Sequence, residues 1–303
     1  MRSAAIREPE PPCAEIAAWR AGDVVEGVFA CVRKDRLTAR TGTPYLAVEL
    51  RDRSGAIKAR AFRRADALAT RFDRGDLVRV SGQVERFRDE LQLELRAIAR
   101  VESGDLEGTA AERFLPVAYR DLDELDGFLE HLCREVHDRE LRALLDRLVS
   151  DDVLRAAWRR APCTRAGHHA YLGGLLEHTV AVATLALEVS PLHPRLDSDL
   201  LLCAAIVHDL GKTGEFTYGA EIGISEHGRL LGHVQLGVEL LERAMAALAT
   251  DAGRRAALLH CVLGHHGPDG LPGRRFQSAE ALALYRLNAL DAGIKGALEH
   301  GLN

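Results

Sequence analysis

Hydrophobic and polar residues alternate over five short stretches in the first third of the chain. Alternation with a period of two is typical of β-strands, and it covers residues 23–32, 45–51, 56–62, 77–87 and 91–99. Turn-forming sequences such as Asp52-Arg53-Ser54-Gly55 separate the stretches. A short helical pattern over residues 65–72 lies between the third and the fourth stretch. The pattern therefore predicts a five-stranded β-domain with one helix after its third strand.

The rest of the chain has the period of amphipathic helices. Leucine-rich stripes over residues 122–136 and 141–148 predict a helical hairpin, and Asp151 opens a further helix that Pro162 ends. Residues 213–229 are rich in glycine and are predicted to form a long loop. The two halves are separated by a stretch rich in Gly, Glu, Ala and Thr. We therefore expect a flexible N-terminus (1–19), a β-domain (20–105), a linker (106–118) and an all-α domain (119–303).

Five strands with a helix after the third strand is the order of an OB-fold, a barrel that binds single-stranded nucleic acid through a basic groove and stacking side chains. Residues 20–105 hold 18 Lys and Arg against 14 Asp and Glu, whereas the whole chain has a net charge of −5. The candidate contacts are basic or aromatic residues of this domain: Arg33, Lys34, Tyr45, Lys58, Arg60, Phe62 and Arg88. A barrel used only for subunit packing is the alternative interpretation.

The overall composition, 47% hydrophobic and 28% charged, is that of an ordinary soluble globular protein. No apolar run approaches the ~20 residues of a membrane span. The first residues are charged and proline-rich, unlike a signal peptide, so we expect a cytoplasmic protein with no membrane partner. The six cysteines form no Cys-x-x-Cys pair, which argues against a zinc ribbon and against a disulfide framework.

Histidines and carboxylates recur between residues 165 and 291, in the motifs LLEHT, HDLGK, GRLLGH, LGHHG and LNALDA. Ligands that converge from several helices on one cavity are how helical bundles build metal sites. Any one of these histidines is more simply explained by packing or capping. Together, however, they would leave many buried polar groups unpaired unless metal ions bind them. The candidate ligands are His178, His208, Asp209, His233, His265, His266 and Asp291.

The ligand types predict two divalent transition-metal ions. Imidazole suits Mn, Fe, Co, Ni and Zn, and a carboxylate can bridge two cations through its two oxygens. We expect the ions to share Asp209, one being held also by His178, His208 and Asp291, and the other by His233, His265 and His266. A two-metal centre stabilises the attacking and leaving oxygens of a displacement at phosphorus. Lys212 would contact a phosphate oxygen, so Asp209 and Lys212 are the expected catalytic residues.

The H…HD…D pattern resembles the HD-domain metal-dependent phosphohydrolase superfamily, and the additional H…HH resembles its two-metal branches. HHAYLGGLLEHT at residues 168–179, together with HDLGK, GRLLGH and LGHHG, is similar to the YhaM-type 3′-5′ exoribonucleases over nearly the whole chain from about Asp23. The resemblance implies an N-terminal OB-fold, a C-terminal HD domain, and metal-dependent removal of nucleotides from the 3′ end of single-stranded RNA, in some members also DNA. It adds His168 and His169 as substrate-binding candidates, and it is compatible with a homo-oligomer.

One position departs from that resemblance. The family tends to have DNLD where this chain has Asn288, Ala289, Leu290 and Asp291. The expected ligand Asp291 is kept, while the neutral Asn288 would alter metal affinity or metal choice. Manganese is the first expectation for the metal, with iron, cobalt, nickel and zinc as alternatives. Two other functions stay open: a phosphohydrolase for a nucleotide or cyclic dinucleotide with the OB-fold as a sensing or assembly module, and a non-catalytic nucleic-acid-binding protein.

Overall fold

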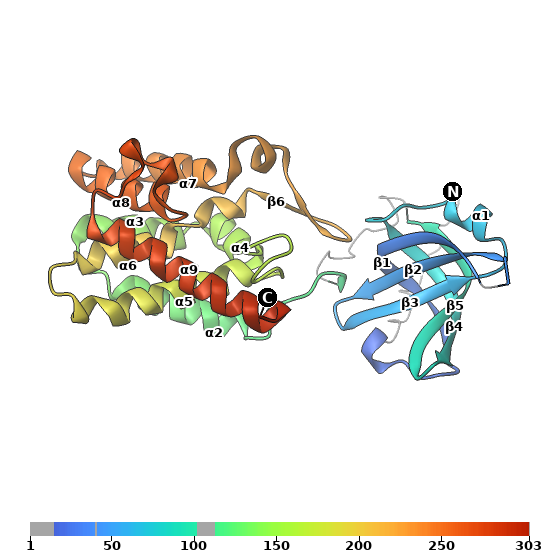
Figure 1. Ribbon diagram of the computed structural model, residues 1–303. Helices are drawn as coiled ribbons and strands as arrows, with labels where there is room; N and C mark the ends of the chain where they lie inside the picture. Colours follow the sequence, from blue (N-terminus) through green and yellow to red (C-terminus); the bar gives the residue numbers. More distant parts are fainter. Residues whose placement is uncertain (1–14, 40, 102–112, 303) are drawn as a thin grey trace, which may run out of the picture. The chain divides into compact units, whose positions relative to one another are not determined.

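The computed structural model describes residues 15–39, 41–101 and 113–302, which divide into two compact units. The first unit comprises Met1–Leu115 with Tyr218–Glu221, and the second comprises Pro116–Thr217 with Ile222–Asn303. Figure 1 shows a barrel of strands in blue and green and a set of helices in green to red. Each unit has its own hydrophobic core. This confirms the predicted combination of a small all-β OB-fold barrel and a helical domain.

The first unit is a closed barrel with the strand order β1-β2-β3-β5-β4. The strands are β1 (Val24–Thr38), β2 (Pro44–Asp52), β3 (Gly55–Ala61), β4 (Leu77–Phe87) and β5 (Glu90–Arg100). Neighbouring strands are antiparallel, except that β3 and β5 are parallel. Helix α1 (Ala65–Ala69) follows β3. This order and this helix position are those of an OB-fold.

The alternating sequence of each strand decides which side chains enter the barrel. In β4, Val78, Val80 and Val84 are buried while the residues between them are partly exposed or are glycine. The barrel begins earlier than predicted, because Ile16 and Trp19 are buried in its core and Trp19 packs edge-on against Phe29. This corrects the last residues of the N-terminal segment predicted for 1–19. Residues 1–14, and most of the predicted linker, lie outside the described residues.

The second unit consists mainly of helices. They are α2 (Leu122–Arg134), α3 (Arg139–Val149), α4 (Asp152–Arg160), α5 (Gly174–Val189), α6 (Ser198–Val207), α7 (Glu226–Leu248), α8 (Ala252–Gly264) and α9 (Ala279–His300). Aspartate caps the start of α2, α3, α4, α6 and α8, where its carboxylate accepts from backbone N–H groups. Serine does the same for α7 and α9. The polar residues that precede each apolar stripe therefore set where the helices begin.

Helices α5 and α6 form the centre of the second unit. Residues 200–207 of α6 are all buried, α2 and α9 pack against α5, and α8 packs against α6. In Figure 1, α9 lies along α5. By length and composition, the segment Gly174–Leu192 is long and apolar enough to cross a membrane. However, 56% of its apolar 18-residue stretch is buried inside the structure. Its apolar character is that of a core helix.

The segment 213–229 is not the continuous loop that the sequence predicted. It contains a two-stranded sheet, β6 (Phe216–Tyr218) with β7 (Ile222–Ile224), and the first turn of α7. A short 3₁₀ helix, η5 (Leu210–Thr213), precedes the sheet and packs against α7. Each strand of this hairpin has only 3 residues, so the alternation of polar and apolar residues cannot distinguish it from a loop in the sequence.

The contact between η5 and α7 requires glycine at position 211. A Cβ atom on Gly211 would collide with the backbone oxygen of His233 and the backbone nitrogen of Gly237. We predict that Gly211→Ala destabilises the second unit by about 3 kcal/mol, because backbone atoms cannot move aside as a flexible side chain can. Urea denaturation followed by circular dichroism measures the change.

The matched control is Gly293→Ala on α9, where an added Cβ meets nothing within 4 Å. This variant should leave stability unchanged or raise it by about 0.5–1 kcal/mol, because alanine favours a helix more than glycine does. Equal destabilisation by both variants would contradict the close approach of η5 and α7.

Candidate metal centre and nucleic-acid surface

The predicted ligands gather at one place in the second unit. They come from different helices: His178 from α5, His208 and Asp209 from the end of α6, His233 from α7, His265 and His266 from the end of α8, and Asp291 from α9. The side chains of His178, His208 and His265 are fully buried, and Asp209 is 1% exposed. The packing of α5, α6, α8 and α9 thus brings together residues that are far apart in the sequence.

His178, His208 and Asp209 form the first group. The Nε2 atoms of the two histidines are 3.3 Å apart. Asp209 Oδ2 lies 3.6 Å from His178 Nε2 and 3.4 Å from His208 Nε2. Ligand atoms that are ~2.1 Å from one shared ion lie ~3.0 to 3.5 Å from each other. The spacing of the three atoms is therefore close to that of a single metal site.

The second group is built on the other oxygen of Asp209. Asp209 Oδ1 lies 3.5 Å from His233 Nε2 and 3.4 Å from His265 Nε2. His266 Nε2 is 2.8 Å from His233 Nε2. Among the described residues, neither Asp209 Oδ1 nor His265 Nε2 has a hydrogen-bond partner, although both atoms are buried. Two such orphaned atoms facing each other are what a cation would satisfy.

Four of the histidines have their Nδ1 atoms occupied by oxygen acceptors. The partners are Asp291 for His178 (2.6 Å), the carbonyl of Ala205 for His208 (2.9 Å), Glu215 for His233 (3.3 Å) and the carbonyl of Val262 for His265 (2.5 Å). These oxygens accept hydrogen bonds, so each Nδ1 carries the proton and each Nε2 presents a lone pair. The lone pairs converge on Asp209, and the residues therefore fit two divalent cations.

Asp291 does not join the first group. Its Oδ2 lies 2.6 Å from His178 Nδ1 and 3.1 Å from His169 Nε2, and the possible metal-binding groups pair it with those two histidines. Burial by itself raises the pKa of Asp291, but the hydrogen bonds from His169 and His178 outweigh burial and hold that pKa below its usual range. Because Nε2 of His178 is the atom that faces His208 and Asp209, Asp291 lies behind the ring and orients it.

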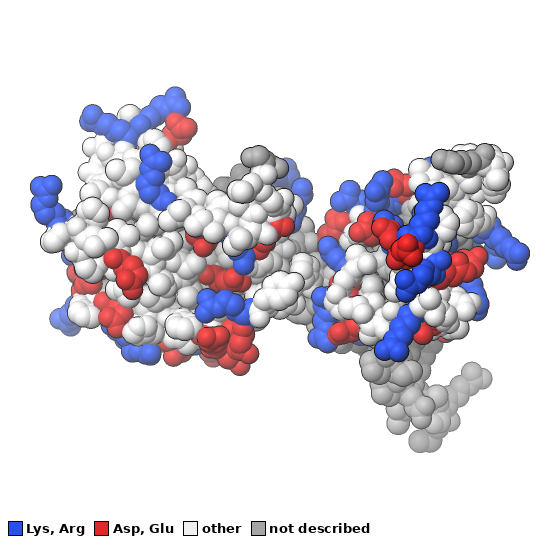
Figure 2. Space-filling view, turned by 60° about the horizontal axis from the view of Figure 1, so that its bottom comes forward, with Lys and Arg blue, Asp and Glu red and all other residues white. Residues whose placement is uncertain are grey.

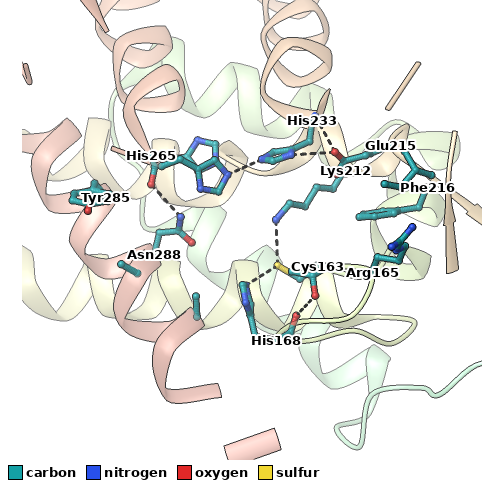
Figure 3. Close-up of a pocket in the computed structure, with 15 residues that line it drawn as sticks. Cys163, Arg165, His168, Lys212, Glu215, Phe216, His233, His265, Tyr285 and Asn288 are labelled. Carbon is teal, nitrogen blue, oxygen red and sulfur yellow. Dashed lines mark hydrogen bonds and ion pairs between the residues drawn. The ribbon is translucent and has the colours of Figure 1, made fainter. Parts of the chain in front are cut away.

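Asn288 occupies the inner position that was predicted for Asp291. Its Oδ1 is 3.0 Å from His178 Nε2, and its Nδ2 donates to the carbonyl of His265 at 3.1 Å, which fixes the orientation of the amide. Figure 3 shows this amide between α9 and the end of α8. A neutral oxygen, rather than a carboxylate, therefore faces the first group. Metal binding by Asp291 itself stays a prediction.

Lys212 is buried beside the shared carboxylate. Its Nζ donates to Asp209 Oδ2 at 2.6 Å and contacts Cys163 Sγ at 3.4 Å. Burial lowers the pKa of Lys212, but the charge of Asp209 outweighs burial and raises it, so the ammonium form persists. Burial raises the pKa of Asp209, but the charge of Lys212 outweighs burial and holds that pKa well below its usual range. Asp209 is therefore ionised, as a metal ligand must be.

A cavity of about 480 Å³ opens onto the second group and Lys212. Figure 3 shows Glu215 and Phe216 on one side of it and Tyr285 on the other. His168 lines the cavity, and burial lowers its pKa to about 4, so its ring is neutral. His169 is 1% exposed and contacts Asp291 and the hydroxyl of Tyr171 instead. Of the two predicted substrate contacts, the described cavity thus includes only His168.

Two residues of the centre had no distinct signal in the sequence, because Cys163 and Glu215 belong to none of the histidine motifs. Glu215 became recognisable only through its contact with His233 Nδ1. Its position three residues after Lys212, near the end of η5, would have been the only clue.

The candidates on the barrel fall into two sets. Tyr45 stacks on Phe62 with ring centroids 5.1 Å apart, and the Arg60 guanidinium lies over Tyr45 at 5.9 Å. Arg60 and Arg88 both lie over Phe87, at 5.2 and 5.3 Å. Phe62 is 46% exposed and Phe87 is 44% exposed, so their faces are accessible. We call Tyr45, Arg60, Phe62, Phe87 and Arg88 the aromatic patch; Phe87 is a member that the sequence analysis missed.

The remaining barrel candidates are paired with acidic neighbours. Arg33 pairs with Asp35, Lys34 with Asp73, and Lys58 with Glu90. Figure 2 shows Lys and Arg interspersed with Asp and Glu on the visible face of this unit. The barrel therefore offers stacking surfaces with nearby guanidinium groups rather than a uniformly positive face.

The fold and the centre define a class of protein. A family model described as "HD domain" matches residues 175–293, and a model described as "OB-fold nucleic acid binding domain" matches residues 25–100. The chain is thus an HD-domain protein with an N-terminal OB-fold.

Similar proteins narrow this class to one family. Proteins named "3′-5′ exoribonuclease YhaM" from Bacillus velezensis and Bacillus subtilis are each 30% identical over 246 residues, which is 81% of this chain and 77% of the relative. The protein of that name from Listeria innocua is 27% identical over 282 residues, covering 91% of this chain and 87% of the relative. The chain belongs to the YhaM family of 3′-5′ exoribonucleases, which confirms the resemblance seen in the motifs.

The two α9 residues near His178 can be separated by metal binding. Asp291→Asn keeps an oxygen that accepts from His178 Nδ1, so we predict that this variant binds added manganese as tightly as the unchanged protein does. Asp291→Ala removes that oxygen and should lower manganese affinity about 10- to 100-fold. Equilibrium dialysis with elemental analysis measures both. Loss of one metal equivalent in Asp291→Asn would show instead that Asp291 is a direct ligand.

Proposed function

We propose that this chain is a metal-dependent 3′-5′ exoribonuclease that hydrolyses the phosphodiester bonds of single-stranded RNA. The observation that carries the proposal is the buried carboxylate of Asp209, whose two oxygens face two separate groups of imidazole nitrogens. The relatives named as 3′-5′ exoribonucleases support the same activity. A nucleotide phosphohydrolase and a non-catalytic binding protein are not favoured by any observation on these residues.

The proposed ligands divide between two divalent cations. His178, His208 and the amide oxygen of Asn288 would hold one, and His233, His265 and His266 the other, with Asp209 shared between them. The mixture of imidazole and carboxylate leads us to propose manganese, with iron, cobalt, nickel and zinc as alternatives. Such cations supply charge stabilisation at the oxygens around the phosphorus atom.

The remaining polar residues would position these ligands and the substrate. Asp291 and Glu215 hold the rings of His178 and His233 by accepting from Nδ1. Lys212 balances the charge of Asp209 and, at the cavity wall, adds a positive charge toward a phosphate oxygen. We therefore retain Asp209 and Lys212 as the proposed catalytic residues.

The cavity suits one end of a chain rather than its middle. Its volume of about 480 Å³ is that of a small-molecule site, so we propose that the terminal nucleotide enters it. Phe216 and Tyr285 line it and offer aromatic contacts for a base. His168 would then donate to or accept from the sugar or the phosphate.

Affinity for a longer substrate would come from the aromatic patch of the barrel. Stacking on aromatic side chains contributes ~1–3 kcal/mol per base and tolerates any sequence. Since stacking does not read the 2′-hydroxyl, we propose single-stranded DNA as a second substrate. We further propose that residues 20–105 and 119–303 act as the binding and catalytic domains of a cytoplasmic protein, and that it forms a homo-oligomer.

Digestion of 5′-end-labelled single-stranded RNA across Mn, Co, Ni, Zn and Mg tests the activity. We predict a ladder that shortens from the 3′ end, strongest with a transition metal, because the proposed ligands include imidazoles. Asp209→Ala should lose bound metal and all hydrolysis while keeping its helical circular dichroism spectrum.

Free nucleotides and cyclic dinucleotides serve as competing substrates in the same series. Turnover of these with no shortening of RNA would favour the phosphohydrolase alternative. RNA binding without hydrolysis under every metal would favour the non-catalytic alternative.

The aromatic patch is tested by substitution of Arg60, which contacts two of its rings. Arg60→Ala combined with Phe62→Ala should raise KM for long single strands about tenfold or more, because stacking and cation contacts are lost, and should leave kcat for a dinucleotide unchanged. The matched control is Arg36→Ala, which removes an exposed arginine paired with Asp66 outside the patch. Equal KM values for the double variant and the control would assign the barrel to sensing or assembly.

A further inference from the structure

A third set of donor atoms adjoins the first group. Cys163 Sγ and one nitrogen each of His168 and His178 all lie within 4.8 Å of one another. Cys163 is 1% exposed, and its Sγ is 3.5 Å from His168 Nε2. Figure 3 shows His168, Cys163 and Lys212 in a row along the cavity. The proposed reaction uses neither the thiol nor this grouping.

The sulfur–nitrogen distance in this set matches that of two ligands on one zinc ion. With Zn–S of ~2.3 Å and Zn–N of ~2.1 Å, sulfur and nitrogen ligands of one ion lie ~3.5 Å apart. The Cys163 and His168 atoms show this separation. Asp209 Oδ2 lies beside this set, 3.8 Å from Cys163 Sγ and 3.6 Å from His178 Nε2. Sulfur and imidazole nitrogen are both accepted zinc ligands.

Thiolate ligands discriminate among metals. Sulfur favours zinc and similar thiophilic ions, whereas manganese favours oxygen and imidazole. An ion bound to Cys163 would displace the thiol proton to solvent. It would also displace Lys212, whose ammonium now contacts both Cys163 Sγ and Asp209 Oδ2. Occupancy of this set is therefore incompatible with the contacts that surround Asp209 in the present arrangement.

We propose that Cys163, His168 and His178 form a zinc-selective inhibitory site that overlaps the first cation site. The two sites share His178, so zinc held by the thiolate excludes the cation that serves hydrolysis. Zinc bound at this set, rather than at the two hydrolytic sites, then inhibits the enzyme in competition with manganese. The binding part of the inference stands without the proposed function, and only the inhibition part rests on it.

Cobalt(II) is the spectroscopic probe for binding, because a cobalt–thiolate bond gives a charge-transfer band in the near ultraviolet. Every protein in this experiment is the full chain with Cys13→Ser. This substitution removes a thiol that lies outside the described residues, so that it cannot contribute to the band. The Cys13→Ser protein, which we call the parent, should show a band with the intensity of one thiolate-bound cobalt ion per chain. Added zinc should abolish this band. Cys163→Ser should lack the band, and His168→Gln should weaken cobalt binding at this site at least tenfold.

The matched control is Cys203→Ala, which removes an equally buried thiol on α6 outside this set. It should keep the full band. A band that persists in Cys163→Ser, or a parent protein without a band, would overturn the proposed site. His168→Gln leaves Cys163 in place, so its cobalt affinity tests the proposed site even if Cys163→Ser folds poorly.

Inhibition is measured as manganese-supported RNA hydrolysis at increasing zinc, each variant being compared with its own rate without zinc. Cys163→Ser should raise the zinc concentration for half-inhibition at least tenfold, and Cys203→Ala should not change it. Equal zinc sensitivity of parent and Cys163→Ser would overturn the inhibitory role. A parent that hydrolyses no RNA under any metal would refute the proposed function, while the cobalt band would still decide whether the site exists.

Discussion

The second unit depends on an ionised carboxylate held almost without solvent at the end of α6. Burying such a charge is costly unless it is paired, and Asp209 is paired by Lys212 and surrounded by imidazoles. Its position at the C-terminal end of a helix adds partial negative charge from the helix dipole. Both effects favour cations at this point, and α5, α7, α8 and α9 must converge there to supply the remaining donors.

The packing around this carboxylate fixes the positions of the donor atoms as much as their own contacts do. Helix α6 is buried along residues 200–207, so its end cannot move independently of the core. Gly211 allows the backbone of α7 to approach η5, and that approach brings His233 to Asp209 Oδ1. The HDLGK motif therefore carries a packing requirement as well as two proposed metal ligands and a lysine. A side chain at this glycine would push the α7 backbone, and with it His233, away from Asp209.

The barrel uses a different kind of interaction. Several of its cations are satisfied by acidic neighbours, as with Arg33 and Asp35, which reduces their attraction for phosphates. The aromatic patch keeps exposed ring faces with Arg60 and Arg88 over them. Binding through such a patch would combine stacking on the rings with the positive charge of the two guanidinium groups. Sequence-independent capture of single strands is the expected consequence.

The sequence by itself determined the elements and most of the chemistry. Alternation of period two predicted the five strands of the OB-fold, and the histidine motifs predicted which residue types would meet. Tertiary structure decided which atoms face one another. Residues 288 and 291 are separated by about 60° around a helix, so periodicity alone cannot say which one faces His178. The packing of α9 against α5 and α8 placed Asn288 inside and Asp291 behind the ring. Contacts between distant segments likewise bring Lys212 to Cys163 and Arg60 to Phe87.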